Sequence, residues 1–533
     1  MTTIENPILP GFHPDPSICR AGEWYYIATS TFQWFPGVRI HRSRDLMHWE
    51  LCPSPLTRVS QLPMRGIPDS GGIWAPCLSY TPPTGARPAL FWLIYTVVRS
   101  RGQAQADFPN FLVTTESIDQ PWSEPIFLNS SGFDPSLFHD EDGRHWLSNM
   151  VWDHRTGRNP FAGILLQEYD AEARRLVGPI KNIFKGTDLG VTEGPHIYKR
   201  DGRYYLMTAE GGTFWDHAVT MARSDTIDGP YEVDPGYPML TARHDPELKI
   251  QKSGHASLVE TPEGDVVLAH LGGRPIGPDR RCMLGRETSL QRCHWTSDGW
   301  LRLTTGKNTP EPSFDAPTEA LHTSEPRGHI ERFDTQRLHP AFQSLRVPVD
   351  ETWLSLRDRP GFCRLRGRDS LFSLFDQSLV ARRVQAFKCR AATRVEFAPT
   401  TFQQMAGLIA YYDCRDWYYV HVTLDDDGNR VIRLSQTDDG TYKDDLTQDL
   451  VAPDEGPIDL RLEIDHASLR FRVRLDPADD WRSFGPELDA TILSDDYGVG
   501  WDHFTGAFVG FCCQDLSGQR QHADFDWFEY AEG

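Results

Sequence analysis

The chain has 533 residues, too many for a single hydrophobic core, and a formal net charge of −21. Such an excess of negative charge disfavours nucleic-acid backbones and anionic membrane surfaces as partners, because like charges repel. The N-terminus lacks the pattern of a signal peptide, and no stretch approaches the roughly 20 apolar residues that span a bilayer. The ten cysteines form no CxxC pair, so neither a zinc site nor a disulfide framework is predicted. We expect two or three domains in a soluble, cytoplasmic protein.

The first notable motif is GFHPDPS at residues 11–17, in which Asp15 lies between Pro14 and Pro16. Proline fixes its own φ and biases the preceding residue toward extended geometry, so an extended trace is predicted for His13 and Asp15. A carboxylate held so rigidly either stabilises a turn or takes part in binding or catalysis.

The segment that begins at Asp15 recurs along the first 300 residues. The copies are DPSI, WAPCL, DPSLF, EGPHI and HASLV, and their first residues are separated by 59, 60, 59 and 62 positions. Most copies continue as two apolar runs joined by an acidic-Gly turn, which is typical of a β-hairpin. Five such units predict a five-bladed β-propeller. The residues that head the copies should then converge on one central pocket; they are Asp15, Trp74, Asp134, Glu193 and His255.

After Leu303 the chain becomes rich in Pro, Thr and Glu, which indicates a linker. Beyond it, segments such as WYYVHVTLD and IDLRLEID alternate apolar and polar residues, as half-buried strands do. The predicted fold is therefore all-β: a five-bladed propeller over 1–310, a linker over 311–328 and a β-sandwich over 329–533.

Three carboxylates at equivalent repeat positions need an explanation, because buried like charges raise one another's pKa. Asp15 and Asp134 could bind strand-end amides while Glu193 binds a structural cation. Glycoside hydrolysis explains all three together: one carboxylate is the base, one carboxyl is the acid and the third tunes the acid.

Several segments resemble glycoside hydrolase family 43, notably GFHPDPSI, GIWAP, FDPSLFHDEDGRHWL, VTEGPHIYKRDGRYYLMTAEGG and TGAFVGFCCQD. The resemblance covers essentially the whole chain and is strongest to two-domain β-xylosidases with a concanavalin-like C-terminal sandwich. It implies that Asp15 is the general base, Glu193 the general acid and Asp134 the residue that tunes and orients the acid. Because the family inverts the anomeric centre, the acid and base should be roughly 6.5 to 9.5 Å apart.

The same resemblance implies further substrate-binding residues, and each has a purely structural alternative. Arg286 in LGRETSL would bind sugar hydroxyls, although it could form a surface ion pair instead. His255 would lie near the axis, or be an ordinary buried histidine. Phe508 of TGAFVG would close the pocket. The remaining pocket residues, whose rings could otherwise be core, are Phe32, Trp74, Phe133, Trp152 and Thr213.

The implied activity is that of an inverting exo-acting β-1,4-xylosidase on xylooligosaccharides, with α-L-arabinofuranosidase side activity. No cofactor is required, and the resemblance leaves room for calcium or another divalent cation near the propeller axis. A homo-oligomer, dimer or tetramer, is expected.

Three alternatives remain open. The first is a mainly arabinofuranosidase activity on the same architecture, and the second is a retaining five-bladed hydrolase that cleaves fructan or sucrose. The third is a carbohydrate-binding propeller without catalysis.

Overall fold

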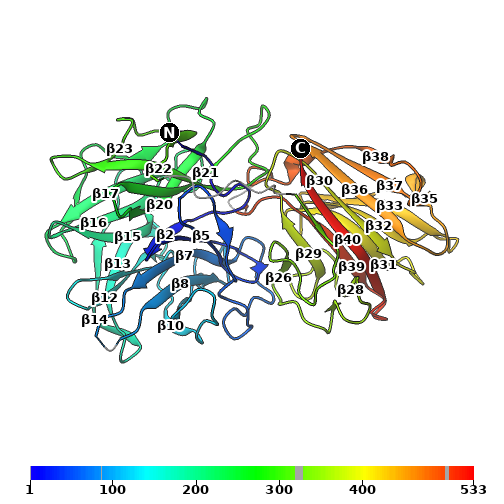
Figure 1. The fold of residues 1–533 in the computed structure, drawn as a ribbon, viewed down its shortest axis with the longest axis horizontal. Helices are drawn as coiled ribbons and strands as arrows, with labels where there is room; N and C mark the ends of the chain where they lie inside the picture. Colours follow the sequence, from blue (N-terminus) through cyan, green and yellow to red (C-terminus); the bar gives the residue numbers. More distant parts are fainter. Residues whose placement is uncertain (1, 86, 319–327, 499–502) are drawn as a thin grey trace.

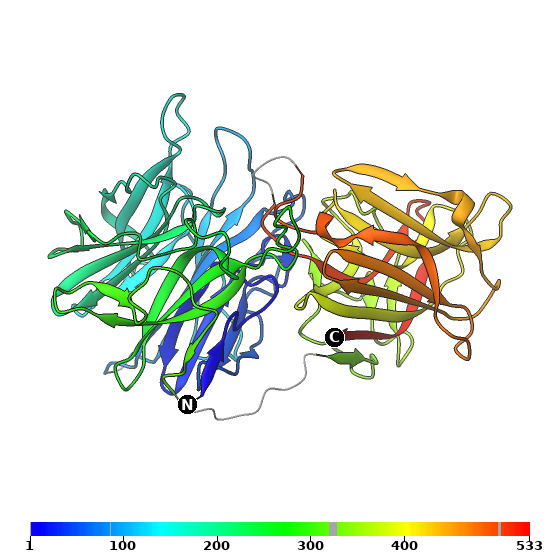
Figure 2. The ribbon, with the colours of Figure 1, turned by 90° about the horizontal axis from the view of Figure 1, so that it is seen from above.

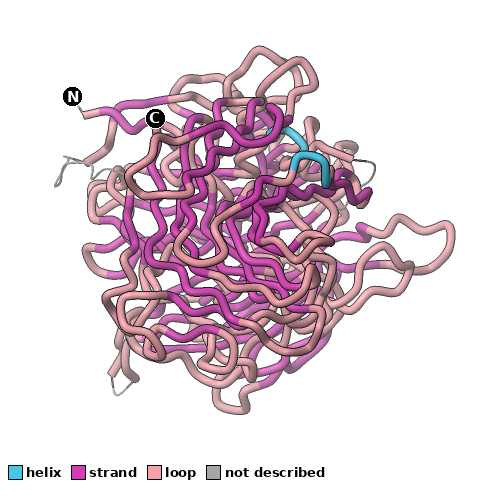
Figure 3. Tube along the Cα trace, turned by 90° about the vertical axis from the view of Figure 1, so that its right-hand side faces the viewer, coloured by secondary structure: helices cyan, strands magenta, loops and turns pink. Residues whose placement is uncertain are grey.

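The computed structural model describes residues 2–85, 87–318, 328–498 and 503–533. These residues form β-strands throughout, with two short 3-10 helices, η1 (Leu446–Gln448) and η2 (Ala490–Ile492). Figure 1 shows an N-terminal body in blue to green beside a C-terminal body in yellow-green to red, and in Figure 3 strands and loops make up nearly all of the trace. The predicted all-β fold is confirmed.

The N-terminal body consists of five antiparallel sheets arranged as blades. Blade 1 contains β2 (Ser17–Ala21), β3 (Trp24–Thr29), β5 (Arg39–Ser43) and β6 (Glu50–Leu51). Blade 2 contains β7 (Gly72–Thr81), β8 (Leu90–Val98), β9 (Asn110–Thr115) and β10 (Ile126–Asn129). Blade 3 contains β11 (Ser136–His139), β12 (His145–Trp152), β13 (Phe161–Asp170) and β14 (Arg175–Phe184). Blade 4 contains β15 (Glu193–Arg200), β16 (Arg203–Glu210), β17 (Ala218–Ser224) and β18 (Glu232–Val233), with β19 (Leu240–Thr241) also paired to β17. Blade 5 contains β20 (Gln251–Glu260), β21 (Val266–Gly273), β22 (Glu287–Trp295) and β23 (Leu301–Leu303).

The first strand of every blade lies on the inside of a closed ring. β2 contacts β7, β7 contacts β11, β11 contacts β15, β15 contacts β20, and β20 returns to β2. Strands inside a blade are covered on both faces by neighbouring blades, which explains continuous apolar runs such as LFWLIYTVV in β8. The repeat of about 60 residues is therefore one blade, and the five-bladed propeller is confirmed.

The propeller extends beyond residue 310, where the sequence predicts a linker. β24 (Ser313–Asp315) pairs with β1 (Thr3–Glu5), and Phe314 packs against the buried cluster that contains Ile4. The Thr318 hydroxyl donates to the Asp45 carbonyl at 2.6 Å. Residues 311–318 thus belong to the propeller and join the two ends of that domain, while 319–327 lie outside the described residues.

The C-terminal body is a sandwich of two antiparallel sheets. One sheet contains β25 (His329–Glu331), β27 (Leu354–Ser355), β28 (Cys363–Arg366), β30 (Lys388–Glu396), β36 (Ile458–Asp465), β37 (Ser468–Arg474), β38 (Arg482–Asp489) and β40 (His522–Glu532). The other contains β26 (Gln343–Leu345), β29 (Ser378–Arg383), β31 (Gln404–Tyr411), β32 (Trp417–Leu424), β33 (Arg430–Asp438), β34 (Thr441–Asp444), β35 (Leu450–Val451), β39 (Phe508–Asp515) and one further strand from the propeller. In β36 the side chains of Leu460, Leu462 and Ile464 are buried in the core between the sheets, as the alternating pattern predicts.

That further strand is β4 (Trp34–Phe35), which comes from blade 1 and pairs with β26 at the edge of the second sheet. The Trp34 ring is fully buried and stacks on Phe508 with ring centroids 3.8 Å apart. Figure 2 shows the two bodies side by side. The two domains therefore share a continuous hydrogen-bonded sheet as well as a packed core.

Candidate active site

The five residues that head the repeats line one cavity of about 310 Å³ at the propeller axis. Asp15 and Asp134 lie two residues before the first strands of blades 1 and 3, and Glu193 begins the first strand of blade 4. Trp74 and His255 lie within β7 and β20. Five residues spread over 240 positions thus face the same space, as the repeat predicts.

The backbone turns at this ring in a repeated way. Asp15, Asp134 and His255 have φ of 56°, 53° and 41°, and in the other two copies the next residue, Ala75 or Gly194, has φ of 36° or 56°. The extended trace predicted for Asp15 is therefore wrong. Left-handed backbone costs an ordinary residue roughly 1–2 kcal/mol, and aspartate tolerates it better than most. Because the conformation recurs in all five blades, it belongs to the architecture that turns these side chains toward the axis.

The strand register also shifts at the inner ring. β-Bulges interrupt the pairing of β7 after Trp74, of β15 after Glu193 and of β20 beside Gly254. A bulge re-aims the side chain next to it, which makes such positions common beside functional sites. Trp74 and Glu193 are thereby placed on the lining of the cavity.

Asp15 is held by charged and polar donors. The Arg286 guanidinium donates from Nη1 to Oδ1 at 3.1 Å, and the Ser30 hydroxyl donates to Oδ2 at 2.6 Å. His255 Nδ1 lies 3.6 Å from Oδ1. These contacts fix the orientation of a buried carboxylate and complement its negative charge.

Asp134 interacts electrostatically with both of the other carboxyl groups. Its Oδ2 accepts the Gly194 N–H at 3.0 Å and lies 4.0 Å from His255 Nδ1. Burial raises the pKa of Asp134 well above its usual value, and the charge of Asp15 raises it further, while Gly194 and Arg286 act in the opposite direction.

Glu193 is the carboxyl group best suited to carry a proton. Burial raises its pKa well above the usual value, followed by repulsion from Asp134 and Asp15. In the part of the chain that the structure describes, no donor binds its side chain, whereas Asp134 has the Gly194 N–H. When the cluster holds one proton, that proton is therefore favoured on Glu193, which leaves a neutral acid beside an oriented base.

The aromatic residues predicted for the pocket form a continuous wall. Ring centroids are 5.9 Å apart for Phe32 and Trp74, 5.3 Å for Trp74 and Phe133, and 6.3 Å for Phe133 and Trp152. Thr213 lines the cavity as well. All of the predicted pocket residues except one therefore meet at this site.

The exception is Phe508, and the prediction that it closes the pocket is wrong. Phe508 is fully buried at the start of β39, where it stacks on Trp34 behind the cavity. Phe504, four residues earlier, lines the cavity instead and stacks on Phe32 with centroids 6.2 Å apart. Phe504, in the segment before β39, therefore contributes to the wall of the pocket, whereas Phe508, the first residue of β39, is buried in the core.

Sequence reasoning also missed part of the rim. Arg101, in the turn between β8 and β9, lies over the Phe504 ring at 5.4 Å. The other lining residues without a predicted role are Gly102, Gln103, Ala106, Phe108, Phe161, Val191 and Gly212. Gly102, Gln103 and Ala106 lie in the loop after β8, and Gly212 follows the end of β16. These loops share no sequence repeat, so the period that located the inner strands did not reveal them.

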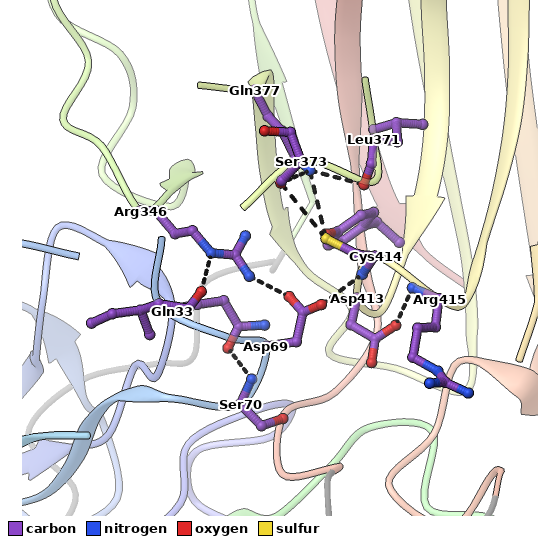
Figure 4. A network of polar contacts seen from close by, with 12 residues as sticks. Gln33, Asp69, Ser70, Arg346, Leu371, Ser373, Gln377, Asp413, Cys414 and Arg415 are labelled. Atoms are coloured by element: carbon purple, nitrogen blue, oxygen red, sulfur yellow. Dashed lines mark hydrogen bonds and ion pairs between the residues drawn. The ribbon is translucent and has the colours of Figure 1, made fainter. Parts of the chain in front are cut away.

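A polar network at the domain junction supports the Phe504 side of the pocket (Figure 4). Arg346 from the sandwich binds Asp69 Oδ1 at 2.5 Å, and the Cys414 N–H donates to Asp69 Oδ2 at 3.1 Å. The next residue, Ser70, accepts the Phe504 N–H on its hydroxyl and the Trp74 indole N–H on its carbonyl. The loop at 67–70 thus connects the sandwich to the wall of the pocket.

Known proteins share this architecture over its full length. The family described as Glycosyl hydrolases family 43 matches residues 4–301, and the Beta xylosidase C-terminal Concanavalin A-like domain matches residues 330–531. A protein of Humicola insolens named Xylosidase/arabinosidase 43B is 48% identical, covering 99% of this chain and 98% of its own length. A Vibrio protein named Xylan 1,3-beta-xylosidase is 45% identical, covering 100% of this chain and 99% of its own.

Solved structures agree with the fold. The crystal structure of xylan beta-1,4-xylosidase from Bacillus Halodurans C-125 is similar with a TM-score of 0.95 and 52% identity, covering 99% of this chain and 100% of that one. A propeller whose axis holds three buried carboxyl groups, matched over its whole length by such enzymes, defines the chain as a glycoside hydrolase. The chain belongs to glycosyl hydrolases family 43, with the concanavalin-like C-terminal domain of β-xylosidases.

Proposed function

We propose that the chain is an inverting exo-acting β-1,4-xylosidase that releases xylose from the non-reducing end of xylooligosaccharides, with α-L-arabinofuranosidase side activity. The observation that carries the proposal is the charge arrangement of the pocket. Glu193, whose pKa is raised and whose carboxyl group accepts no hydrogen bond from the described residues, faces the same cavity as an oriented Asp15. One group is prepared to give a proton and the other to take one.

In the proposed reaction Asp15 is the general base. It removes a proton from a water molecule, whose oxygen attacks the anomeric carbon on the face opposite the leaving group. Glu193, the general acid, protonates the glycosidic oxygen as the bond to carbon breaks. Asp134 keeps the pKa of that acid high and orients it. The product therefore has inverted configuration, and no covalent intermediate forms.

The substrate is held from several sides. Arg286 reaches the cavity beside Asp15 and can donate to sugar hydroxyls from its planar fork. The rings of Phe32, Trp74 and Phe504 supply apolar faces for a pentose. A cavity of about 310 Å³ is at the small end of ligand sites, which favours attack on one terminal sugar.

Relative rates on two aryl pentosides test the choice of sugar. An aryl β-D-xylopyranoside should be cleaved faster than the matching α-L-arabinofuranoside; a faster arabinoside would make the second activity the principal one. That second candidate is favoured by the relative named a xylosidase/arabinosidase. Rates on β-1,4- and β-1,3-linked xylobiose test the choice of linkage, because one similar protein is named a 1,4-xylosidase and another a 1,3-xylosidase. The proposal expects the 1,4-linked disaccharide to be cleaved faster.

Further features of the proposal concern conditions and assembly. Acid, base and water supply every proton, so the proposed reaction needs no cofactor. A divalent cation near the propeller axis would have His255, which lines the cavity, as a nitrogen ligand. Ten free cysteines support a reducing, cytoplasmic location. Among the described residues no helix is long and apolar enough to span a membrane. A dimer or tetramer is the proposed assembly, which light scattering on the purified protein measures.

A further inference from the structure

Two buried aspartates and a histidine meet on the sandwich side of the domain junction, outside the pocket. Asp413 and Asp416 come from the turn between β31 and β32, and His503 precedes Phe504. One ligand atom from each of the three lies within 4.8 Å of the others. Such a separation fits ligands around a single metal ion, because metal–ligand bonds of 2.0 to 2.4 Å place neighbouring ligand atoms about 3 to 4.8 Å apart.

Among the described residues, neither carboxylate is paired with a lysine or arginine side chain. Asp413 and Asp416 are 1% and 0% exposed. Arg415 pairs with Asp439, and Arg346 pairs with Asp69. Burying a carboxylate without a partner charge costs several kcal/mol, and a bound cation would offset that cost.

The hydrogen bonds leave oxygen atoms free for a cation. Asp413 Oδ1 accepts the N–H groups of Arg415 and Asp416, whereas its Oδ2 lies 3.8 Å from His503 Nε2. Asp416 Oδ1 accepts the Asp439 N–H at 2.8 Å. The other oxygen of Asp416, Oδ2, is buried and has no hydrogen-bond partner within the described residues. A buried carboxylate oxygen without a hydrogen-bond partner is uncommon in native structures, and a bound ion is one of the partners that satisfies it.

We propose that Asp413, Asp416 and His503 bind a divalent metal ion that anchors the Phe504 wall of the pocket. Two carboxylate oxygens and one imidazole nitrogen suit Zn²⁺ or Mn²⁺ better than Ca²⁺ or Mg²⁺, which prefer oxygen ligands alone. The site is separate from the propeller axis, where the histidine is His255.

The metal would act on the pocket through the backbone. His503 is bonded directly to Phe504, whose N–H donates to the Ser70 hydroxyl and whose carbonyl accepts from Arg286 Nη2. A metal that binds His503 to the turn at 413–416 would therefore fix the position of the segment that carries Phe504. This second step rests on the proposed function, whereas binding of the metal does not.

The direct test is a zinc soak of the full-length protein followed by diffraction above and below the zinc absorption edge. We expect an anomalous peak bonded to Asp413, Asp416 and His503. A peak confined to other residues, or no peak, would overturn the site.

Calorimetry on protein dialysed against a chelator gives the stoichiometry. About one equivalent of Zn²⁺ or Mn²⁺ should bind, more tightly than Ca²⁺. Loss of a residue that only supports a metal ligand typically weakens metal binding roughly 10–100-fold. Asp416→Asn and His503→Gln remove a ligand itself, so each should weaken binding by more than that. Asp495→Asn is the matched control, because Asp495 is buried nearby and accepts the Tyr412 hydroxyl but is outside the cluster. Equal affinity in all three variants would contradict the assignment, and the diffraction test stands even when a variant fails to fold.

Kinetics test the anchoring. Removal of the metal should raise KM for an aryl xyloside roughly 3- to 10-fold with little change in kcat, because the wall binds substrate and takes no part in proton transfer. An unchanged KM after verified metal loss would refute the anchor but leave the site. A complete lack of hydrolysis with the metal bound would instead refute the proposed function.

Discussion

The floor and the closing wall of the pocket come from different domains and are built by different means. On the floor, Asp15, Asp134 and Glu193 occupy equivalent positions in blades of one repeat, with turned or bulged backbone at each. The wall residue Phe504 comes from a segment of the C-terminal domain and depends on contacts to Ser70 and Arg286. The floor is thus specified by the symmetry of the fold, whereas the wall is specified by the junction between two folds. Changes to the floor should affect chemistry, and changes to the wall should affect binding or stability.

The largest expected effect is on the floor. Glu193→Gln keeps the shape of the side chain but cannot supply a proton, so kcat on xylobiose should fall roughly 10²–10⁴-fold. An aryl xyloside with a good leaving group should lose less, because its oxygen needs less protonation. Glu331→Gln, at a buried glutamate of the sandwich, is the matched control and should keep its kcat. Equal losses on the two substrates would argue against an acid role.

Phe508→Ala tests the packing behind the wall. Removal of this fully buried ring should lower the free energy of unfolding by about 3–5 kcal/mol, measured by denaturant titration. The KM of the folded fraction should change little. A large rise in KM without loss of stability would restore Phe508 to the pocket.

Phe504→Ala should show the opposite behaviour. The ring lines the cavity, so its loss should raise KM about 10-fold, equivalent to about 1.4 kcal/mol of binding, and should hardly alter unfolding. Steady-state kinetics and denaturant titration on the same preparations separate the two phenylalanines. The same changes in KM and in the free energy of unfolding for both variants would show that Phe504 and Phe508 do not have separate roles in the pocket and the core.

The smallest effect is a displacement on the pH axis. The charge of Asp134 raises the pKa of Glu193, so Asp134→Asn should lower that pKa. The basic limb of kcat/KM, where the acid loses its proton, should therefore move to lower pH. A pH–rate profile of the residual activity measures this. A limb that stays in place or moves upward would contradict the proposed coupling.

The period in the sequence accounts for what could be predicted. Because the five copies head the inner strands of five blades, Asp15, Trp74, Asp134, Glu193 and His255 could be placed on one axis from spacing alone. Alternation along segments such as β36 likewise revealed the sandwich. These features depend on local sequence repeated many times, so one sequence contains enough signal.

Features that depend on the junction had no such signal. Phe508 of TGAFVG is an apolar residue at the start of an apolar strand, and Phe504 precedes the same motif. The local sequence does not tell which of the two rings faces the pocket. β4 has only two residues, so its pairing with β26 could not be read from periodicity. Asp15 was misjudged because the prolines limit its backbone locally, while the ring of blades imposes a left-handed turn. Asp416 and His503 are 87 positions apart, and only the fold brings them together.

The central claim is that Asp15 directs a water molecule to the anomeric carbon while Glu193 releases the leaving group in a single displacement. Proton NMR of the first turnovers on β-1,4-xylobiose tests it most directly, because the anomer of the released terminal xylose is observed before mutarotation. The account predicts that α-xylose appears first. Initial formation of β-xylose would show retention of configuration and would contradict the mechanism.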